Sequence, residues 1–403
     1  MTLEGAAAAA SPCYCDRELI FGRSILSAMS RLPKAKRIRA SRPVWREEWL
    51  LVLSLASAGL FALAGERLFE RLGEPLWFAL IFGWLFGVVL ASALAVVRHA
   101  ERIAEALGEP YGTLVLTLSV TAIEVFSVSA VMLHGENNPT LVRDTLFAIV
   151  MIILGGMVGV SLLAGGFRHR EQHYNLQGAN AYLGVIIPLA LLTLSLPNFT
   201  VTTAGPTLSS PQQVFLATVA IGLFIAFLAI QTGRHRRYFT TKDDDEPHHA
   251  PSGHSLGWHA VLLVAYILPV VFLAKQLASP IDYLIETLRL PTALGGVIIA
   301  MLVATPEAVG ATRAALANRL QRSINIFLGS VLSTIGLSVP IMLAVSYVTG
   351  NAIYLGLDPA NSFLLMITLA VSVVTFASGR TNILQGAVHV VLFAAFVMLI
   401  FQG

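Results

Sequence analysis

Apolar runs of about 20 residues recur along this chain, and they limit its fold more than any other feature. A run of that length crosses the hydrocarbon core of a bilayer as one α-helix, in which every backbone polar group is bonded internally. A transmembrane β-barrel is excluded, because its strands are about half as long and alternate between apolar and polar residues. Hydrophobic residues make up 56% of the 403 residues and charged residues 12%, whereas soluble proteins have about 45–50% and about 25%. We therefore predict an all-α integral membrane protein with about 11 transmembrane helices. The expected spans are 47–65, 75–97, 111–133, 144–167, 179–197, 212–232, 257–275, 291–312, 323–348, 360–379 and 382–401.

One long polar insertion, "GRHRRYFTTKDDDEPHHAPSGHS" from Gly233 to Ser255, divides the chain after the sixth span. If the first span is set aside, five spans precede the insertion and five follow it. An odd number of crossings makes the two units enter the membrane from opposite sides, which is the arrangement of inverted repeats in secondary transporters. The predicted organisation is a tail at 1–44, an extra first helix at 45–70, a first five-helix repeat at 75–232, an acidic and histidine-rich loop at 233–256 and a second repeat at 257–403.

The placement of Lys and Arg predicts the orientation of the chain. With the N-terminus inside, 21 of the 26 basic residues fall on the inner side and five on the outer side, a strong positive-inside signal. We expect a multi-pass protein of a bacterial inner membrane, with a cytoplasmic N-terminus and a periplasmic C-terminus. The basic stretch "RLPKAKRIR" of the tail is expected to lie against anionic lipid, and a nucleic-acid partner is not expected on a chain this apolar. Cys13 and Cys15, the two cysteines, describe neither a disulfide framework nor a metal cage.

Two glutamates lie deep inside predicted spans. Gly112 precedes Glu124 by twelve residues in "GTLVLTLSVTAIE", and Gly295 precedes Glu307 by twelve in "GGVIIAMLVATPE". Each stretch is the second span of its unit, so the acids stand in register. A carboxyl group at the bilayer centre costs roughly 2.5–3.5 kcal/mol on insertion scales, and it is therefore a functional candidate. The alternative is a protonated glutamate that joins neighbouring helices by hydrogen bonds.

Matching positions of two repeats related by a pseudo-two-fold axis converge near the midplane. Two carboxylates facing each other in a low dielectric cannot both ionise at small cost, so the pair is expected to hold protons near neutral pH. A hard cation such as calcium reverses that preference, because it takes six to eight oxygen ligands. Glu124 and Glu307 are thus predicted to bind either protons or a cation, which is sufficient for exchange at one site.

Further oxygen ligands lie close to these acids in the sequence. Thr121 precedes Glu124 by one turn and Thr305 lies beside Glu307, while the following helix contributes Asn325, Ser330, Ser333 and Thr334. Hydroxyl groups in membrane helices commonly bond a carbonyl of their own helix, which is the alternative for each of them. Pro306 has no N–H group, so we expect the helix to open before Glu307 and to free the carbonyl of Leu302. No cofactor is predicted apart from the transported ions.

Two further groups are candidates for a role in transport. His389 in the last span is a candidate proton relay, although a neutral histidine bonded to a neighbour is the plainer interpretation. The inner loop is a candidate regulatory cation site, with a solvated charge run as the alternative. Its acidic and imidazole groups are Asp243, Asp244, Asp245, Glu246, His248 and His249.

Four stretches together resemble the bacterial calcium/proton antiporters of the ChaA type, in the calcium/cation antiporter superfamily. They are "LTLSVTAIEV", "VATPEAVGATRAALANRLQRSINIFLGSVLSTIGLSVP", "DDDEPHH" and "SGRTNILQGAVH". The resemblance implies an inner-membrane exchanger that expels calcium, and in this branch also sodium or potassium, for entering protons. It carries the acidic repeat residues onto Glu124 and Glu307, and the small polar positions onto Ser330 and Ser333. The superfamily favours Asn or Gly where Thr121 and Ala122 stand, and serine where Gly156 stands.

Two other classes of function remain to be weighed. A passive cation channel with a glutamate-lined pore is the alternative to an antiporter, but channels usually multiply such residues in oligomeric rings. An intramembrane enzyme is disfavoured because the spans contain no HExxH motif, no paired His and Asp, and no serine with a base. The oligomeric state and the preference among calcium, sodium and potassium do not follow from the sequence.

Overall fold

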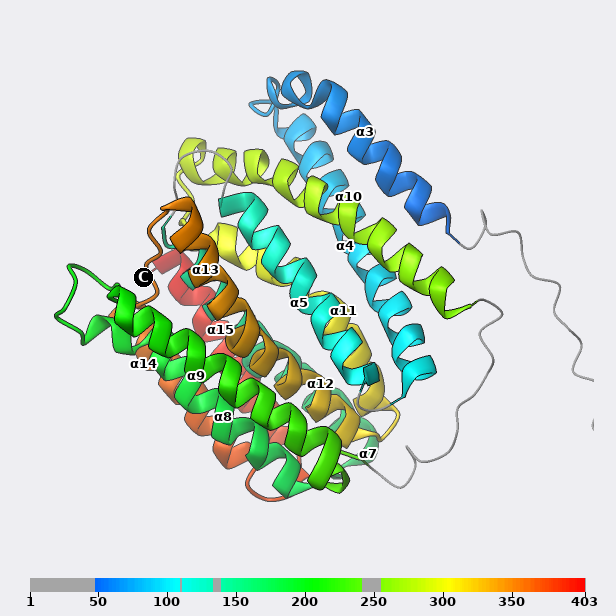
Figure 1. Cartoon of the computed structure of the whole chain (residues 1–403), viewed down its shortest axis with the longest axis vertical. Coiled ribbons are helices and arrows are strands. Elements are labelled where there is room, and N and C mark those ends of the chain that lie inside the picture. Colours follow the sequence, from blue (N-terminus) through cyan, green and yellow to red (C-terminus); the bar gives the residue numbers. More distant parts are fainter. Residues whose placement is uncertain (1–47, 109–110, 133–138, 241–254, 403) are drawn as a thin grey trace, which may run out of the picture. The chain divides into compact units, whose positions relative to one another are not determined.

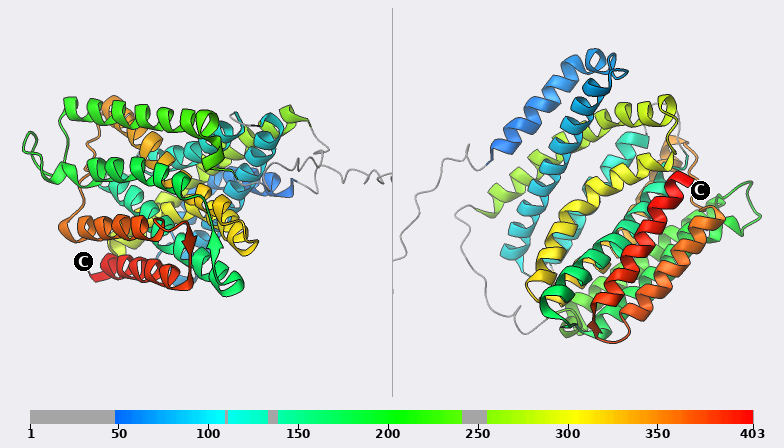
Figure 2. Two further views of the ribbon diagram at one scale, coloured as in Figure 1. Left: turned by 90° about the horizontal axis from the view of Figure 1, so that it is seen from below. Right: turned by 180° about the vertical axis from the view of Figure 1, so that it is seen from behind.

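The computed structural model describes residues 48–108, 111–132, 139–240 and 255–402. Most residues in this part of the chain are helical, and the helices run side by side in a bundle (Figures 1 and 2). The elements are α3 (Trp49–Phe69), α4 (Pro75–Leu107), α5 (Tyr111–Met132), α6 (Leu141–Val150), η1 (Met151–Met157), α7 (Val158–His169), β1 (Gln172–His173), α8 (Leu176–Leu194), η2 (Leu196–Asn198), α9 (Ser210–Ala229), η3 (Ile230–Arg234), η4 (Arg236–Tyr238), α10 (Leu256–Asp282), η6 (Tyr283–Thr287), α11 (Ala293–Leu316), α12 (Leu320–Ser333), η7 (Thr334–Ser338), α13 (Val339–Thr349), α14 (Pro359–Thr375), β2 (Arg380–Thr381) and α15 (Ile383–Gln402).

Ten helical segments of the described chain are long and apolar enough to cross a membrane, and α14 is a shorter apolar helix. The predicted all-α membrane fold is therefore confirmed, with one helix for each expected span. After α3 the order is α4, α5, a third helix made of α6, η1 and α7, then α8 and α9. The second set repeats it as α10, α11, a third helix made of α12, η7 and α13, then α14 and α15. In each set the third helix contains a π-helical segment, a local widening that is frequent at functional sites.

Helix α4 extends ten residues beyond the predicted end of its span, because polar groups near this end find partners on other helices. The carboxylate of Glu48, beside the start of α3, accepts hydrogen bonds from Arg98 of α4 at 2.8 Å and from Tyr266 of α10 at 2.8 Å. His99, the neighbour of Arg98, lies 3.0 Å from His259 of α10, measured between their Nδ1 atoms. These contacts join the extra first helix to the first helix of each five-helix set.

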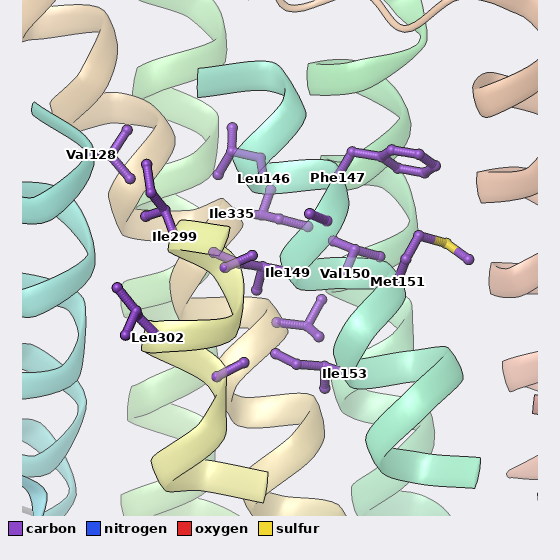
Figure 3. Packing of buried hydrophobic residues seen from close by; sticks show 14 of the residues in the cluster. Val128, Leu146, Phe147, Ile149, Val150, Met151, Ile153, Ile299, Leu302 and Ile335 are labelled. Atoms are coloured by element: carbon purple, nitrogen blue, oxygen red, sulfur yellow. The ribbon is translucent and has the colours of Figure 1, made fainter. Parts of the chain in front are cut away.

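The centre of the bundle is formed by α11, which packs along α6 and also contacts α12, α7 and α4. Figure 3 shows buried side chains of α6 and η1, among them Ile149 and Ile153, beside Ile299 and Leu302 of α11. Gly296 permits this approach, because a Cβ atom there would lie 2.7 Å from the backbone of Asp144 on α6. The helix that carries Glu307 is thus held tightly against the third helix of the first set.

Short polar contacts fix the helix ends on one face of the bundle, which we call the arginine-rich face because it carries Arg168, Arg234, Arg236, Arg313, Arg319 and Arg322. Asn175 caps α8, since its side chain accepts from the N–H of Gln177 at 2.9 Å. Strands β1 and β2 pair antiparallel, Gln172 with Thr381, and so join the loop before α8 to the loop before α15. Hydropathy did not predict this pairing, because two-residue strands leave no period in the sequence.

Candidate functional site

Glu124 and Glu307 come together between the two sets of helices. Glu124 lies on α5 with 2% of its surface exposed, and Glu307 lies on α11 partly exposed to a cavity. Their carboxylates accept hydrogen bonds from residues of one helical turn, Thr334 for Glu124 and Ser330 for Glu307. The two acids, which are 183 positions apart in the chain, are therefore close in the structure.

Hydroxyl groups on one face of the helix formed by α12 and η7 donate hydrogen bonds to both acids. Thr334, the first residue of η7, donates a hydrogen bond from Oγ1 to Oε2 of Glu124 at 2.9 Å. Ser330, four residues earlier on α12, donates from Oγ to Oε2 of Glu307. Residues four apart on a helix lie one above the other, so one helical turn of the second set binds an acid from each set. A rotation of this helix moves hydrogen-bond donors at both carboxylates at once.

A cavity of about 320 Å³ reaches Glu307 from the arginine-rich ends of the helices. Its inner part is lined by Ser330, Ser333 and Thr117, and its mouth by charged side chains. Those charged groups are Glu101, Arg236 and Arg322. Glu124 is not among the lining residues. The cavity therefore reaches one of the two carboxylates directly.

Thr121 is placed as the sequence suggested, on the same face of α5 as Glu124. Its side chain is 3% exposed, and its Oγ1 has no hydrogen-bond partner among the described residues. A buried hydroxyl without a partner costs about 1–3 kcal/mol, so it is usually retained for a reason other than packing. Its position one turn from the acid makes it a candidate ligand oxygen.

The other predicted ligands have partners within the protein. Thr305 donates to the carbonyl of Met301 on its own helix, and Ser333 donates to the carbonyl of Ser330 at 2.9 Å. Both groups of the Asn325 amide are engaged, since Nδ2 donates to the Phe239 carbonyl at 2.6 Å and Oδ1 accepts from Gln321 at 2.9 Å. Each hydroxyl oxygen still has a lone pair for a cation, whereas Asn325 would have to exchange a partner to become a ligand.

The opening expected at Pro306 is not observed, because α11 continues through this proline to Leu316. A carbonyl freed at this depth is tolerated where it faces a cavity, and Pro306 lines the cavity beside Glu307. The irregular backbone near the acids is instead the π-helical turn η7, which begins at Thr334. Its last residue, Ser338, also lies close to the Glu124 carboxylate and was not predicted as a site residue.

His389 lies away from the hydroxyl groups that bind the acids. It is fully buried on α15, and its Nε2 lies 3.0 Å from Oγ1 of Thr375 on α14. No hydrogen bond found within the described chain joins it to either glutamate, so the role of proton relay stays a prediction. The predicted loop ligands, Asp243 to Glu246 with His248 and His249, lie outside the described residues.

Gly156, which stands where the superfamily favours serine, faces away from the acids. A Cβ atom at this position would lie 3.4 Å from ring atoms of Phe393 on α15. The neighbouring Gly159 is closer still, with a Cβ atom there 2.8 Å from the backbone nitrogen of Val390. These glycines allow α7 and η1 to pack closely against α15. Glycine in place of serine at position 156 therefore removes no ligand from the cavity.

The arrangement is suited to hard cations and protons. The groups at the two acids are carboxylate and hydroxyl oxygens, the ligands that sodium, potassium and calcium prefer. No cluster of three His, Cys, Asp or Glu side chains with metal-binding geometry occurs among the described residues.

Comparisons with known proteins relate most of the chain to a family of transporters. A family model for the sodium/calcium exchanger protein matches residues 77–233 and 258–402, nearly the two predicted five-helix units. The chain is 41% identical over 295 residues to the sodium-potassium/proton antiporter ChaA of Escherichia coli, covering 72% of this chain and 80% of that protein. It is 23% identical over 267 residues to a Ca(2+)/H(+) antiporter of Synechocystis, covering 61% and 71% respectively. Among solved structures, native YfkE has a TM-score of 0.68 at 17% identity, over 88% of this chain and 100% of that chain.

Proposed function

The chain belongs to the sodium/calcium exchanger protein family, and from this membership we propose that it exchanges cytoplasmic cations for protons at the site formed by Glu124 and Glu307. The family and the relatives identify it as a cation/proton antiporter that spans the membrane, and those relatives are transporters, not enzymes. Sodium and potassium are proposed as cargo because the Escherichia coli relative bears both in its name. Calcium is proposed because two carboxylates balance the charge of one divalent ion.

The observation that carries this proposal is the shared hydroxyl face of α12 and η7. Ser330 and Thr334 donate to one acid each, so the two carboxylates belong to one polar centre. Two separate structural glutamates would have no need of donors on the same helical turn. The unpartnered oxygen of Thr121 adds a ligand position beside Glu124.

Protons and cations compete at this centre because both neutralise the same charges. Two adjacent carboxylates in a low dielectric are unfavourable when both are ionised. Two protons, or one divalent cation, or monovalent cations together with a proton, remove that cost. Binding of the cation therefore releases protons, and a rise in proton concentration expels the cation.

Transport requires that the centre face the two sides of the membrane in turn. The cavity now leads from Glu307 to the arginine-rich face, which the positive-inside rule assigns to the cytoplasm. We place the protein in a bacterial inner membrane with the N-terminus inside, where this state receives the cytoplasmic cation. Movement of one five-helix unit against the other would then close this cavity and open the opposite side.

Purified protein in proteoliposomes with an internal pH dye tests the proposal. Calcium, sodium and potassium are added outside in turn, and an antiporter moves protons in the direction opposite to the added ion. The alternative function, a passive channel with a glutamate-lined pore, predicts tracer uptake that is unaffected by collapsing the pH gradient. Uptake of that kind, or the absence of proton movement with all three ions, would overturn the proposal.

A further inference from the structure

A short segment, Arg236 to Thr240, lies across the cavity on the arginine-rich side, and we call it the strap. It follows η3 at the end of α9 and includes the turn η4. Three of its residues line the cavity, namely Arg236, Phe239 and Thr240. The strap is thus part of the wall between Glu307 and the end of the bundle.

Phe239 closes the cavity wall by packing among aromatic rings. Its side chain is 4% exposed, and its ring meets Tyr182 of α8 edge-on with centroids 5.5 Å apart and Phe227 of α9 with centroids 5.6 Å apart. Tyr182 is held in place by Gln231 of η3, whose Nε2 donates to its hydroxyl at 2.9 Å. Edge-on aromatic contacts of this kind contribute roughly 0.5–1.5 kcal/mol beyond burial. They hold the Phe239 ring in place, but they are weak enough to break when the strap moves.

Side-chain amides of two helices hold the backbone of the strap. Asn325 of α12 donates to the Phe239 carbonyl at 2.6 Å, and Gln321 of α12 donates to the Tyr238 carbonyl at 3.5 Å. Asn175 at the start of α8 donates to the Arg237 carbonyl at 3.4 Å. Buried carbonyl groups need such partners, since the strap has no regular ladder of its own. The shortest of these bonds comes from the helix that also carries Ser330.

We propose that the strap is the gate on the arginine-rich side of the transport cavity, and that Asn325 is the positioning residue that holds it in the cavity wall, where it narrows the path to Glu307 from that side. This inference rests on the proposed function, because a gate has meaning only for an alternating site. Asn325 lies five residues before Ser330 on α12, so a rotation of α12 that changes the hydrogen bond to Glu307 also pulls on the Phe239 carbonyl. Binding of a proton or a cation at Glu307 is thereby linked to the position of the strap, without any contact between the strap and the ion.

Thiol labelling measures the gate independently of transport. Cys13 and Cys15 are the two native cysteines, and both are replaced by serine. Gly310→Cys then places a reporter on the cavity wall one turn after Glu307, where a Cβ atom meets only Cδ1 of Ile326, at 3.8 Å. A membrane-impermeant methanethiosulfonate reagent is added to inverted and to right-side-out vesicles, and the modification rate is recorded for each.

Two variants open the gate by different routes, and a third variant is the matched control. Asn325→Leu removes the amide that holds the strap, and Phe239→Ala removes the aromatic cover. Asn198→Leu breaks the same kind of bond, from an asparagine amide to the Leu357 carbonyl, at the opposite end of the helices. Loss of one such bond or ring contact is expected to raise the modification rate roughly fivefold to tenfold from the arginine-rich side.

The proposal is supported if Asn325→Leu and Phe239→Ala both accelerate labelling and Asn198→Leu does not. Parental rates in both strap variants would overturn it, as would an equal acceleration by Asn198→Leu, which indicates general loosening. If one strap variant does not fold, as judged by thermal unfolding in detergent, the other decides the result. Faster labelling without any exchange in proteoliposomes would show that the strap restricts access to the cavity but would reject the proposed function and with it the role of gate, so the two failures are distinguishable.

Discussion

Thr334→Val tests whether the hydroxyl face of α12 and η7 tunes the competition between cations and protons. Valine keeps nearly the same shape but removes the donor that lies 2.9 Å from the Glu124 carboxylate. A hydrogen bond to an ionised group contributes about 1.5–3 kcal/mol and one to a neutral group about 0.5–1.5 kcal/mol. The difference, about 1–1.5 kcal/mol, favours the ionised acid that a cation needs. Its loss should therefore raise the half-saturating cation concentration about fivefold to tenfold at neutral pH.

The assay is cation-driven proton movement in proteoliposomes at neutral pH and again at alkaline pH. The increase in the half-saturating cation concentration should be smaller at alkaline pH, because fewer protons then compete for Glu124. Thr368→Val is the matched control, since this threonine is equally buried and contacts neither acid: its Oγ1 lies 2.9 Å from the Leu364 carbonyl of its own helix and 3.6 Å from Sδ of Met151. An unchanged half-saturating concentration for Thr334→Val, or an equal change for Thr368→Val, would refute the reasoning.

Three further substitutions separate binding from stability. Thr121→Ala removes a buried oxygen that has no partner within the described chain, so the melting temperature in detergent should stay the same or rise while cation affinity falls; a lower melting temperature with unchanged affinity would contradict this. Gly159→Ala forces a Cβ atom to within 2.8 Å of the backbone of Val390 and should cost about 1–3 kcal/mol of stability. Gly184→Ala, at a position with no neighbour within 4 Å, is its control, and equal melting temperatures would count against the packing. Glu48→Gln weakens the ion pair with α4 and should destabilise the protein by about 1–3 kcal/mol with exchange retained, so loss of exchange in a folded variant would contradict the account.

The sequence predicted those features that depend on local composition or on internal register. Spans follow from hydropathy because each helix satisfies its own backbone in lipid. Glu124 and Glu307 were predicted as partners because the two units repeat the same spacing to an acid. Ser330 was named because it lies on the helix that follows Glu307 and because the resemblance carries a small polar position onto it.

Contacts between residues that are far apart in the sequence could not be predicted in this way. Thr334 was one oxygen among several, and nothing in the sequence assigns it to Glu124, which lies 210 residues away. Asn325 was expected to face the ion, yet its amide holds the carbonyl of Phe239, because the segment after α9 folds back over α12. Pro306 was expected to open α11, and the irregular turn lies instead in η7, which ends two residues before Pro340 at the start of α13. Each outcome depends on which helices become neighbours, and hydropathy does not specify that.

The central claim is that protons and the cation compete for the two glutamates. Its most direct measurement is proton release from the purified protein in weakly buffered detergent solution, followed with a pH dye as calcium, sodium or potassium is added. The native chain is expected to release protons with saturation in at least one of these titrations. Glu124→Gln and Glu307→Gln should each reduce the release, and the double variant should abolish it. Unchanged proton release by the folded double variant would contradict the claim.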